Sequence, residues 1–145
     1  DITKIAEDKA KQAFQVVRQP LFVNDAGWSI PALNGFPGPF MRYINDWFTF
    51  DDLLRLMKDK KDRSIYFKEV FCFTDGKTTK TFLGQKKGAV LERPEGDEGI
   101  SRSLISMRDD LKSISQSWKE NVLPTDDYKV WKEFAEWYKQ YKTSN

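Results

Sequence analysis

The sequence contains no histidine, and this absence excludes several kinds of chemistry at once. Without imidazole there is no Ser-His or Cys-His nucleophile pair, no histidine-ligated zinc and no imidazole acid–base group. The single cysteine, Cys72, excludes an internal disulfide and favours a reducing compartment, so a cytoplasmic protein is expected. Catalysis is left to carboxylates, lysine, arginine and an oxygen-liganded metal such as magnesium.

The chain also lacks an excess of one charge and any long apolar run. Its 24 basic and 22 acidic residues are mixed along the sequence, which argues against duplex nucleic acid as a partner. No apolar run approaches the roughly 18 residues that span a bilayer, so no membrane partner is expected. With 145 residues, of which 39% are hydrophobic, the chain is long enough for one globular domain with a real core.

Hydrophobic periodicity predicts an α/β fold. A mainly apolar set of residues, which also includes Lys9, recurs at helical spacing over 2–18 and predicts a helix there. Pro20 ends that helix before a short strand at 21–24. Thr49 is suited to cap a second helix. The remaining expectations are a strand at 64–74, a hairpin turn at Asp75-Gly76, strands at 78–84 and 86–92, a loop at 94–99, and helices at 103–120 (interrupted near Pro124) and 126–141. This order indicates a mixed, twisted sheet with flanking helices.

The most informative stretch runs from Phe22 to Gly38. The short strand delivers Asp25 into a small-residue turn, Ala26-Gly27, and a Gly/Pro-rich loop follows at 34–39. A carboxylate at a strand end is a common way to bring a base or a metal up to a ligand. The alternatives are that Asp25 only stabilises its turn and that the loop is only a tight structural connection.

Several segments, taken in order, resemble one enzyme family. Asp25 with Gly27, then the run Ala32-Leu33-Asn34-Gly35-Phe36-Pro37-Gly38, then Tyr66-Phe67-Lys68 leading to Asp75-Gly76, are similar to the inosine/xanthosine triphosphate pyrophosphatases. The resemblance is clearest over 5–99, with a divergent helical part at 100–145. It implies that 1–145 is a single domain of a two-lobed ITPase-like (Maf/Ham-type) fold.

The resemblance also implies an activity and a set of site residues. Members split non-canonical purine nucleoside triphosphates such as ITP, XTP and dITP into monophosphate and pyrophosphate, with Mg²⁺, generally as homodimers. The family's catalytic aspartate falls on Asp25, as base or metal ligand. The substrate-binding positions that the resemblance implies in this chain are Asn24, Gly27, Asn34 and Gly35, together with Lys119, which takes the place of a family lysine if the register shifts by two residues from Asn121. Arg42 is a further phosphate-binding candidate because it follows the Gly/Pro loop. Phe40, Tyr43, Trp47 and Phe48 have spacings suited to a core or a dimer interface, with base stacking as the alternative. Basic residues such as Arg93 and Arg102 are interpreted as solvated, with phosphate contact as the alternative.

The chain departs from the family pattern at several points. Where the family has an aromatic-Asp-Pro segment this chain reads Ile100-Ser101-Arg102, and its Ser-His-Arg triplet aligns with Thr125-Asp126-Asp127. The family's phosphate loop, metal-binding glutamate and first strands would precede Asp1, so a divergent, N-terminally truncated member is expected. The alternative function is therefore a degenerate relative that acts as a nucleotide-binding or dimerising module.

Overall fold

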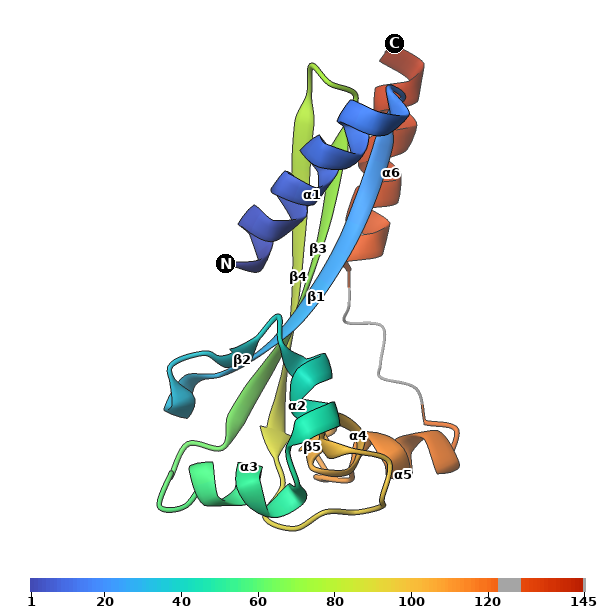
Figure 1. The fold of residues 1–145 in the computed structure, drawn as a ribbon. Coiled ribbons are helices and arrows are strands. Elements are labelled where there is room, and N and C mark those ends of the chain that lie inside the picture. The colour runs from blue at the N-terminus through green and yellow to red at the C-terminus, as the bar shows by residue number, and fades with distance from the viewer. Residues whose placement is uncertain (123–128, 145) are drawn as a thin grey trace. The chain divides into compact units, whose positions relative to one another are not determined.

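The computed structural model describes residues 1–122 and 129–144. The elements, in chain order, are α1 (Ile2–Val17), β1 (Leu21–Ile30), the 3₁₀ turn η1 (Pro31–Leu33), β2 (Phe36–Gly38), α2 (Met41–Trp47), α3 (Phe50–Leu56), β3 (Ser64–Thr74), β4 (Thr79–Val90), α4 (Ile100–Ser103), β5 (Ile105–Ser106), α5 (Ile114–Lys119) and α6 (Val130–Ser144). The strands form one five-stranded sheet in the order β2-β1-β3-β4-β5, with helices around it (Figure 1). The predicted α/β fold with a sheet and flanking helices is confirmed.

The chain divides into two compact units. The first contains Asp1–Ala26, Lys68–Gln85 and the C-terminal segment with α6, and the second contains Gly27–Phe67 and the described part of Lys86–Thr125. Strands β1, β3 and β4 contribute residues to both units. The expectation of a single domain over 1–145 stays a prediction.

In the first unit, alternation along β3 sends its side chains into two separate cores. Val70 and Cys72 pack with Ala6 and Ala10 of α1. Phe71 and Phe73 alternate with these two residues along the strand, so their side chains lie on the opposite face of the sheet. Phe71 and Phe73 pack with Val130 and Phe134 of α6. The two helices therefore cover opposite faces of this part of the sheet (Figure 1). Cys72 is fully buried, which confirms the prediction of a small buried side chain, and this burial raises the pKa of its thiol.

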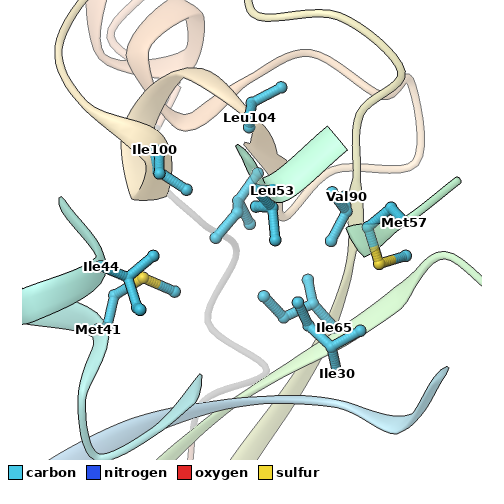
Figure 2. Close-up of a cluster of buried hydrophobic side chains, with 10 residues drawn as sticks. Ile30, Met41, Ile44, Leu53, Met57, Ile65, Val90, Ile100 and Leu104 are labelled. Atoms are coloured by element: carbon cyan, nitrogen blue, oxygen red, sulfur yellow. The ribbon is translucent and has the colours of Figure 1, made fainter. Parts of the chain in front are cut away.

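In the second unit, a larger apolar core joins residues of four strands to three short helices. Figure 2 shows its side chains converging from these elements. The buried members are Ile30, Met41, Ile44, Leu53, Met57, Ile65, Val90, Ile100, Leu104 and Ile105. Helix α3 begins at the predicted cap: Thr49 Oγ1 accepts a hydrogen bond from the Asp52 amide at 3.3 Å, and Asp52 Oδ2 accepts one from the Thr49 amide at 2.8 Å. This reciprocal capping box satisfies two amides at the start of the helix.

Several predicted boundaries are wrong, and the error at β1 has a nonlocal cause. Strand β1 does not stop before Asp25 but continues to Ile30, because its second half pairs antiparallel with β2, where Trp28 is opposite Gly38 and Ile30 is opposite Phe36. The two runs predicted at 78–84 and 86–92 form one strand, β4. Helix α2 and strand β2 were not expected.

The helix predicted over 103–120 is replaced by α4, β5 and α5. Ser113 caps α5, and its hydroxyl donates to the Glu95 carbonyl at 3.0 Å. Ser115 donates to Glu98 Oε2 at 2.6 Å. These bonds to the 94–99 loop hold 103–120 as separate short elements, which the periodicity of apolar residues alone does not predict. Of the predicted terminal helix, the described part begins at Val130, while 126–128 and Pro124 lie outside the described residues.

Candidate functional site

Asp25 lies in the middle of β1, opposite a cation from α1. Its carboxylate Oδ2 is 2.5 Å from the Lys9 Nζ, and Oδ1 accepts a hydrogen bond from the Ala26 amide at 3.1 Å. The Asp25 side chain is only 15% exposed, whereas that of Lys9 is 55% exposed. The pair therefore places a mostly shielded carboxylate beside an ammonium group that still reaches solvent. The expected turn position of Asp25 is wrong, but its carboxylate is held in a defined place.

Lys9 is a residue that the sequence reasoning missed. The sequence does contain a signal for it, because Lys9 lies at helical spacing with the apolar residues of α1. A lysine on the face of a helix that packs against a sheet needs either a solvent path or a negative partner. Lys9 has both, since it is half exposed and bonded to Asp25.

Asn24 binds a neighbouring strand rather than Asp25. Its amide Nδ2 donates to Glu69 Oε1 at 2.8 Å and more weakly to the Val70 carbonyl at 3.4 Å. These bonds fix β1 against β3 directly before the carboxylate. Asn24 thus helps to hold the backbone that carries Asp25.

The Asn34-Gly35 pair forms the turn between η1 and β2. Both residues have positive φ, 54° and 90°, in the region that favours Asn and Gly. Their amides donate to the Pro31 carbonyl and the Ile30 carbonyl, each at 3.0 Å. The positive φ angles of the turn therefore explain why Asn and Gly occupy these two positions. A role of either residue in binding substrate stays a prediction. Gly27 is a buried residue of β1, two positions beyond Asp25.

Arg42 lies beside a pocket of the second unit. The pocket has a volume of about 470 Å³. Among its lining residues are Trp28, Arg42, Asn45, Asp46, Arg102 and Trp118. The Arg42 side chain is 88% exposed, and its Nε lies 4.0 Å from Asp46 Oδ2, so the arginine is only loosely held. Lys119 ends α5, next to Trp118, and is not among the lining residues.

The predicted site residues thus fall into separate groups. Asn24 and Asp25 belong to the first unit, together with Lys9, whereas Gly27, Asn34, Gly35, Arg42 and Lys119 belong to the second. Within the second unit, only Arg42 of these residues lines the pocket. Arg102, which the sequence suggested was simply solvated, lines it too.

No cluster of three or more Asp, Glu, Cys or His side chains suited to a metal ion occurs among residues 1–122 and 129–144. Asp25 therefore does not belong to such a cluster in the described part of the chain. Magnesium is commonly bound through one or two protein carboxylates together with waters and substrate phosphates. The donor at Asp25 is therefore compatible with a metal that arrives with a polyphosphate. In the same described residues, no helix has the length and apolar character needed to cross a bilayer.

The fold and the site define an α/β protein with a strand-borne carboxylate paired to a lysine. A family model described as "Ham1 family" matches residues 1–101. The chain belongs to the Ham1 family, which confirms the family predicted from sequence.

Relatives and solved structures agree with this membership. The chain is 33% identical over 143 residues to the dITP/XTP pyrophosphatase of Saccharolobus solfataricus, covering 97% of this chain and 74% of the relative. It is 32% identical over 142 residues to the dITP/XTP pyrophosphatase of Methanopyrus kandleri, covering 95% and 75%. The crystal structure of a nucleoside-triphosphatase (dITP/XTP pyrophosphatase) from Mycobacterium abscessus matches with a TM-score of 0.69 at 20% identity, covering 84% of this chain and 68% of that one.

Proposed function

We propose that this chain is a nucleoside-triphosphate pyrophosphatase that hydrolyses non-canonical purine nucleoside triphosphates such as dITP and XTP. Water and the triphosphate would give the nucleoside monophosphate and pyrophosphate. The observation that carries the proposal is the similarity, over nearly the whole chain, to relatives named dITP/XTP pyrophosphatase. The carboxylate–lysine pair on β1 and α1 supports it, because both groups suit chemistry on a polyphosphate.

In this proposal the two charged groups of the first unit have complementary roles. Asp25 either accepts a proton from the attacking water or serves as the carboxylate ligand of a divalent metal, with Mg²⁺ the expected ion. The metal, when bound, would neutralise charge on the phosphates. Lys9 has three N–H donors and spends one on Asp25, so the others can reach an incoming phosphate. The bond to Lys9 also orients the Asp25 carboxylate.

The roles of the other predicted residues follow from where they lie. Asn24 positions the strand that carries Asp25. Gly27 and Gly35 have no side chain, so their backbone allows a ligand to approach closely, and Asn34 shares the turn of Gly35. Arg42, whose side chain is 88% exposed, and Lys119 are the proposed cations of the second unit for a phosphate.

A homodimer is part of the same proposal. Phe40, directly before α2, and Tyr43 and Trp47 of α2 are exposed, and Trp47 is 74% exposed. The Tyr43 and Trp47 rings lie 5.1 Å apart and form a continuous aromatic surface with Phe40. Exposed aromatic groups of this kind are typical of protein interfaces. Light scattering coupled to size exclusion would give the mass of the assembly, and a monomer at micromolar concentration would contradict this part. Cytoplasmic location belongs to the proposal as well.

The deciding experiment is pyrophosphate release by the purified chain from ITP, XTP, dITP and the canonical triphosphates, with and without Mg²⁺. We expect release from the keto-purine substrates that depends on the metal and is abolished in D25N. Asp8→Asn, an exposed carboxylate of α1, is the matched control and should retain activity. Nucleotide binding without turnover in the unmodified chain would favour the alternative, a degenerate binding module.

A further inference from the structure

A second pocket of the second unit is lined almost entirely by charged side chains. It has a volume of about 600 Å³ and lies around α3 and the segment that leads from α3 to β3. Its five cations, which define it here as the basic pocket, are Arg55, Lys58, Lys60, Lys61 and Arg63. The volume is that of a small-molecule site, but ligand sites are usually lined by apolar side chains. A lining of this composition suits a highly charged ligand.

The cations of the basic pocket have no carboxylate partner among the described residues. Asp51, Asp59 and Glu92 are on the same lining. No ion pair in the described part of the chain, however, includes any of these charged residues. Five cations against three carboxylates leave a formal excess of two positive charges around one cavity. Such an excess raises the local concentration of anions.

The segment that carries the cations is held by its own hydrogen bonds. The Lys58 amide donates to the Arg55 carbonyl at 3.1 Å, and the Lys60 amide donates to the Met57 carbonyl at 3.2 Å. Between these bonds Asp59 has a φ of 62°, a conformation that aspartate tolerates. Met57 is 1% exposed and belongs to the apolar core of Figure 2. The lysines therefore extend from a turn that a buried side chain anchors.

Arg63 is fixed more firmly than the lysines. Its Nε donates to the Val90 carbonyl at 2.8 Å, and its Nη2 donates to the Leu91 carbonyl at 2.7 Å. A guanidinium has five N–H donors, so three remain after these two bonds. The charge of Arg63 is thus held at the end of β4 with donors left for a ligand. Groups that are already ordered lose less entropy when a ligand binds.

Electrostatic support of α3 explains only part of this cluster. Cations near the C-terminal end of a helix interact favourably with its dipole, but the effect falls off within the last turn. Arg55 lies in the last turn of α3, and Lys58 follows the C-cap residue Met57. Lys60, Lys61 and Arg63 lie further along the chain. Their presence at the same cavity needs another explanation.

The chemistry of the lining matches linked phosphate groups. Phosphate oxygens are acceptors for ammonium and guanidinium donors, and their charge strengthens these bonds. The lining contains no aromatic residue, whereas bases of single-stranded nucleic acids are bound largely by stacking on aromatic rings. The three carboxylates limit the positive excess, which suits a short phosphate chain better than a long polyanion.

We propose that the basic pocket binds a short chain of linked phosphates, which is either inorganic pyrophosphate or triphosphate or the phosphate tail of a nucleotide. Arg63 is its fixed anchor, and the exposed lysines are its adjustable contacts. The basic pocket shares no residue with the Lys9–Asp25 pair or with the pocket beside Arg42. The inference therefore goes beyond the proposed function and does not depend on it.

Amide NMR spectra of the ¹⁵N-labelled chain report binding at the basic pocket itself. The chain is titrated with inorganic tripolyphosphate, pyrophosphate, ATP and adenosine in metal-free buffer. We expect the amides of 58–63 to shift saturably with the three phosphate compounds and not with adenosine. Tighter binding of tripolyphosphate than of ATP would identify the free chain as the ligand, and the reverse order would identify the nucleotide tail. Shifts with ATP alone, or with adenosine, would overturn the inference.

A double variant tests whether the cations of the pocket carry the binding. K58A/K61A removes two exposed lysines and should weaken tripolyphosphate binding roughly 2- to 30-fold at the remaining amides of 58–63. K4A/K139A, which removes two exposed lysines outside the pocket, is the matched control and should leave it unchanged. Equal weakening in both variants, or shifts that do not saturate, would show non-specific attraction and overturn the inference. Binding here by a chain that releases no pyrophosphate would contradict only the proposed function.

Discussion

Replacing Lys9 by methionine should reduce catalysis far more than it reduces stability. Methionine keeps the length and the apolar stem of lysine but loses the ammonium group that bonds to Asp25 at 2.5 Å. The side chain of Lys9 is 55% exposed, so solvent screens much of the attraction. Measured pairs of this kind contribute about 0.2–1 kcal/mol, and we expect a loss of stability in that range.

The expected catalytic loss is larger because substrate phosphates carry more charge than Asp25 alone. A hydrogen bond from a charged donor contributes about 1.5–3 kcal/mol. If Lys9 donates one such bond in the transition state, kcat/KM for ITP should fall roughly 10- to 150-fold. Since the bond would form to the phosphates and not to the base, the ratio of ITP to ATP should stay the same.

The two losses are measured on one preparation. Urea titration followed by tryptophan fluorescence gives the free energy of unfolding, and a pyrophosphate-release assay gives kcat/KM. Lys11→Met, an exposed lysine of the same helix, is the control for removing one positive charge. The reasoning would be refuted if K9M kept the activity of this control but lost well over about 1 kcal/mol of stability. Lys9 would then be only a structural partner of Asp25.

Four further results are expected. Phe71→Ala should lower the free energy of unfolding by about 3–5 kcal/mol in urea titration, because Phe71 is fully buried against α6, whereas Val16→Ala, at a residue 84% exposed, should change it little. Thr49→Ala should cost about 1 kcal/mol in the same assay through loss of the α3 cap, and Thr49→Ser should restore most of it. Glu120 accepts from Lys112 Nζ at 2.6 Å and from Arg108 Nη1 at 3.0 Å, and its bonds to Lys112, Gln116 and Arg108 lower its pKa to about 2. Its contribution to stability is therefore complete above the ordinary pKa of 4.5 and is lost as the pH falls from there toward 2. Glu120→Gln should flatten that part of an acid-unfolding curve, and an unchanged curve would contradict this prediction. The buried Cys72 thiol, whose pKa is raised, should react with a thiol reagent only as fast as the protein unfolds, and rapid labelling of the folded chain would show otherwise.

The sequence predicted those elements whose signals are local. Strand β3 has its predicted bounds because β-branched and aromatic residues fill it and Asp75-Gly76 ends it with a turn. Asp75 Oδ1 accepts from the Lys77 and Thr78 amides at 2.8 and 2.6 Å, so the turn is stabilised by hydrogen bonds between its own residues. The cap of α3 was predictable for the same reason, since Thr49 and Asp52 are three residues apart.

Other elements depend on partners far along the chain. Nothing within Asp25-Ala26-Gly27 says that the strand continues, because its second half is held by β2. The pairing of Lys9 with Asp25 spans 16 positions and depends on how α1 packs on the sheet. The Asn45–Ser101 pair spans 56 positions, so the pocket beside it was invisible to any search for motifs. Family resemblance pointed to Asp25, and the position of Arg42 after the Gly/Pro loop pointed to Arg42, but the residues that surround them required coordinates.

Loss of the charged pair should affect every nucleoside triphosphate alike. Asp25 and Lys9 both belong to the first unit and contact each other. In the proposed function they act on phosphate or water, which are common to all nucleoside triphosphates. D25N and K9M should therefore lower kcat/KM for ITP and for ATP by the same factor. A variant of Lys9 that altered the ratio of ITP to ATP would mean that the charged pair on β1 and α1 also senses the base.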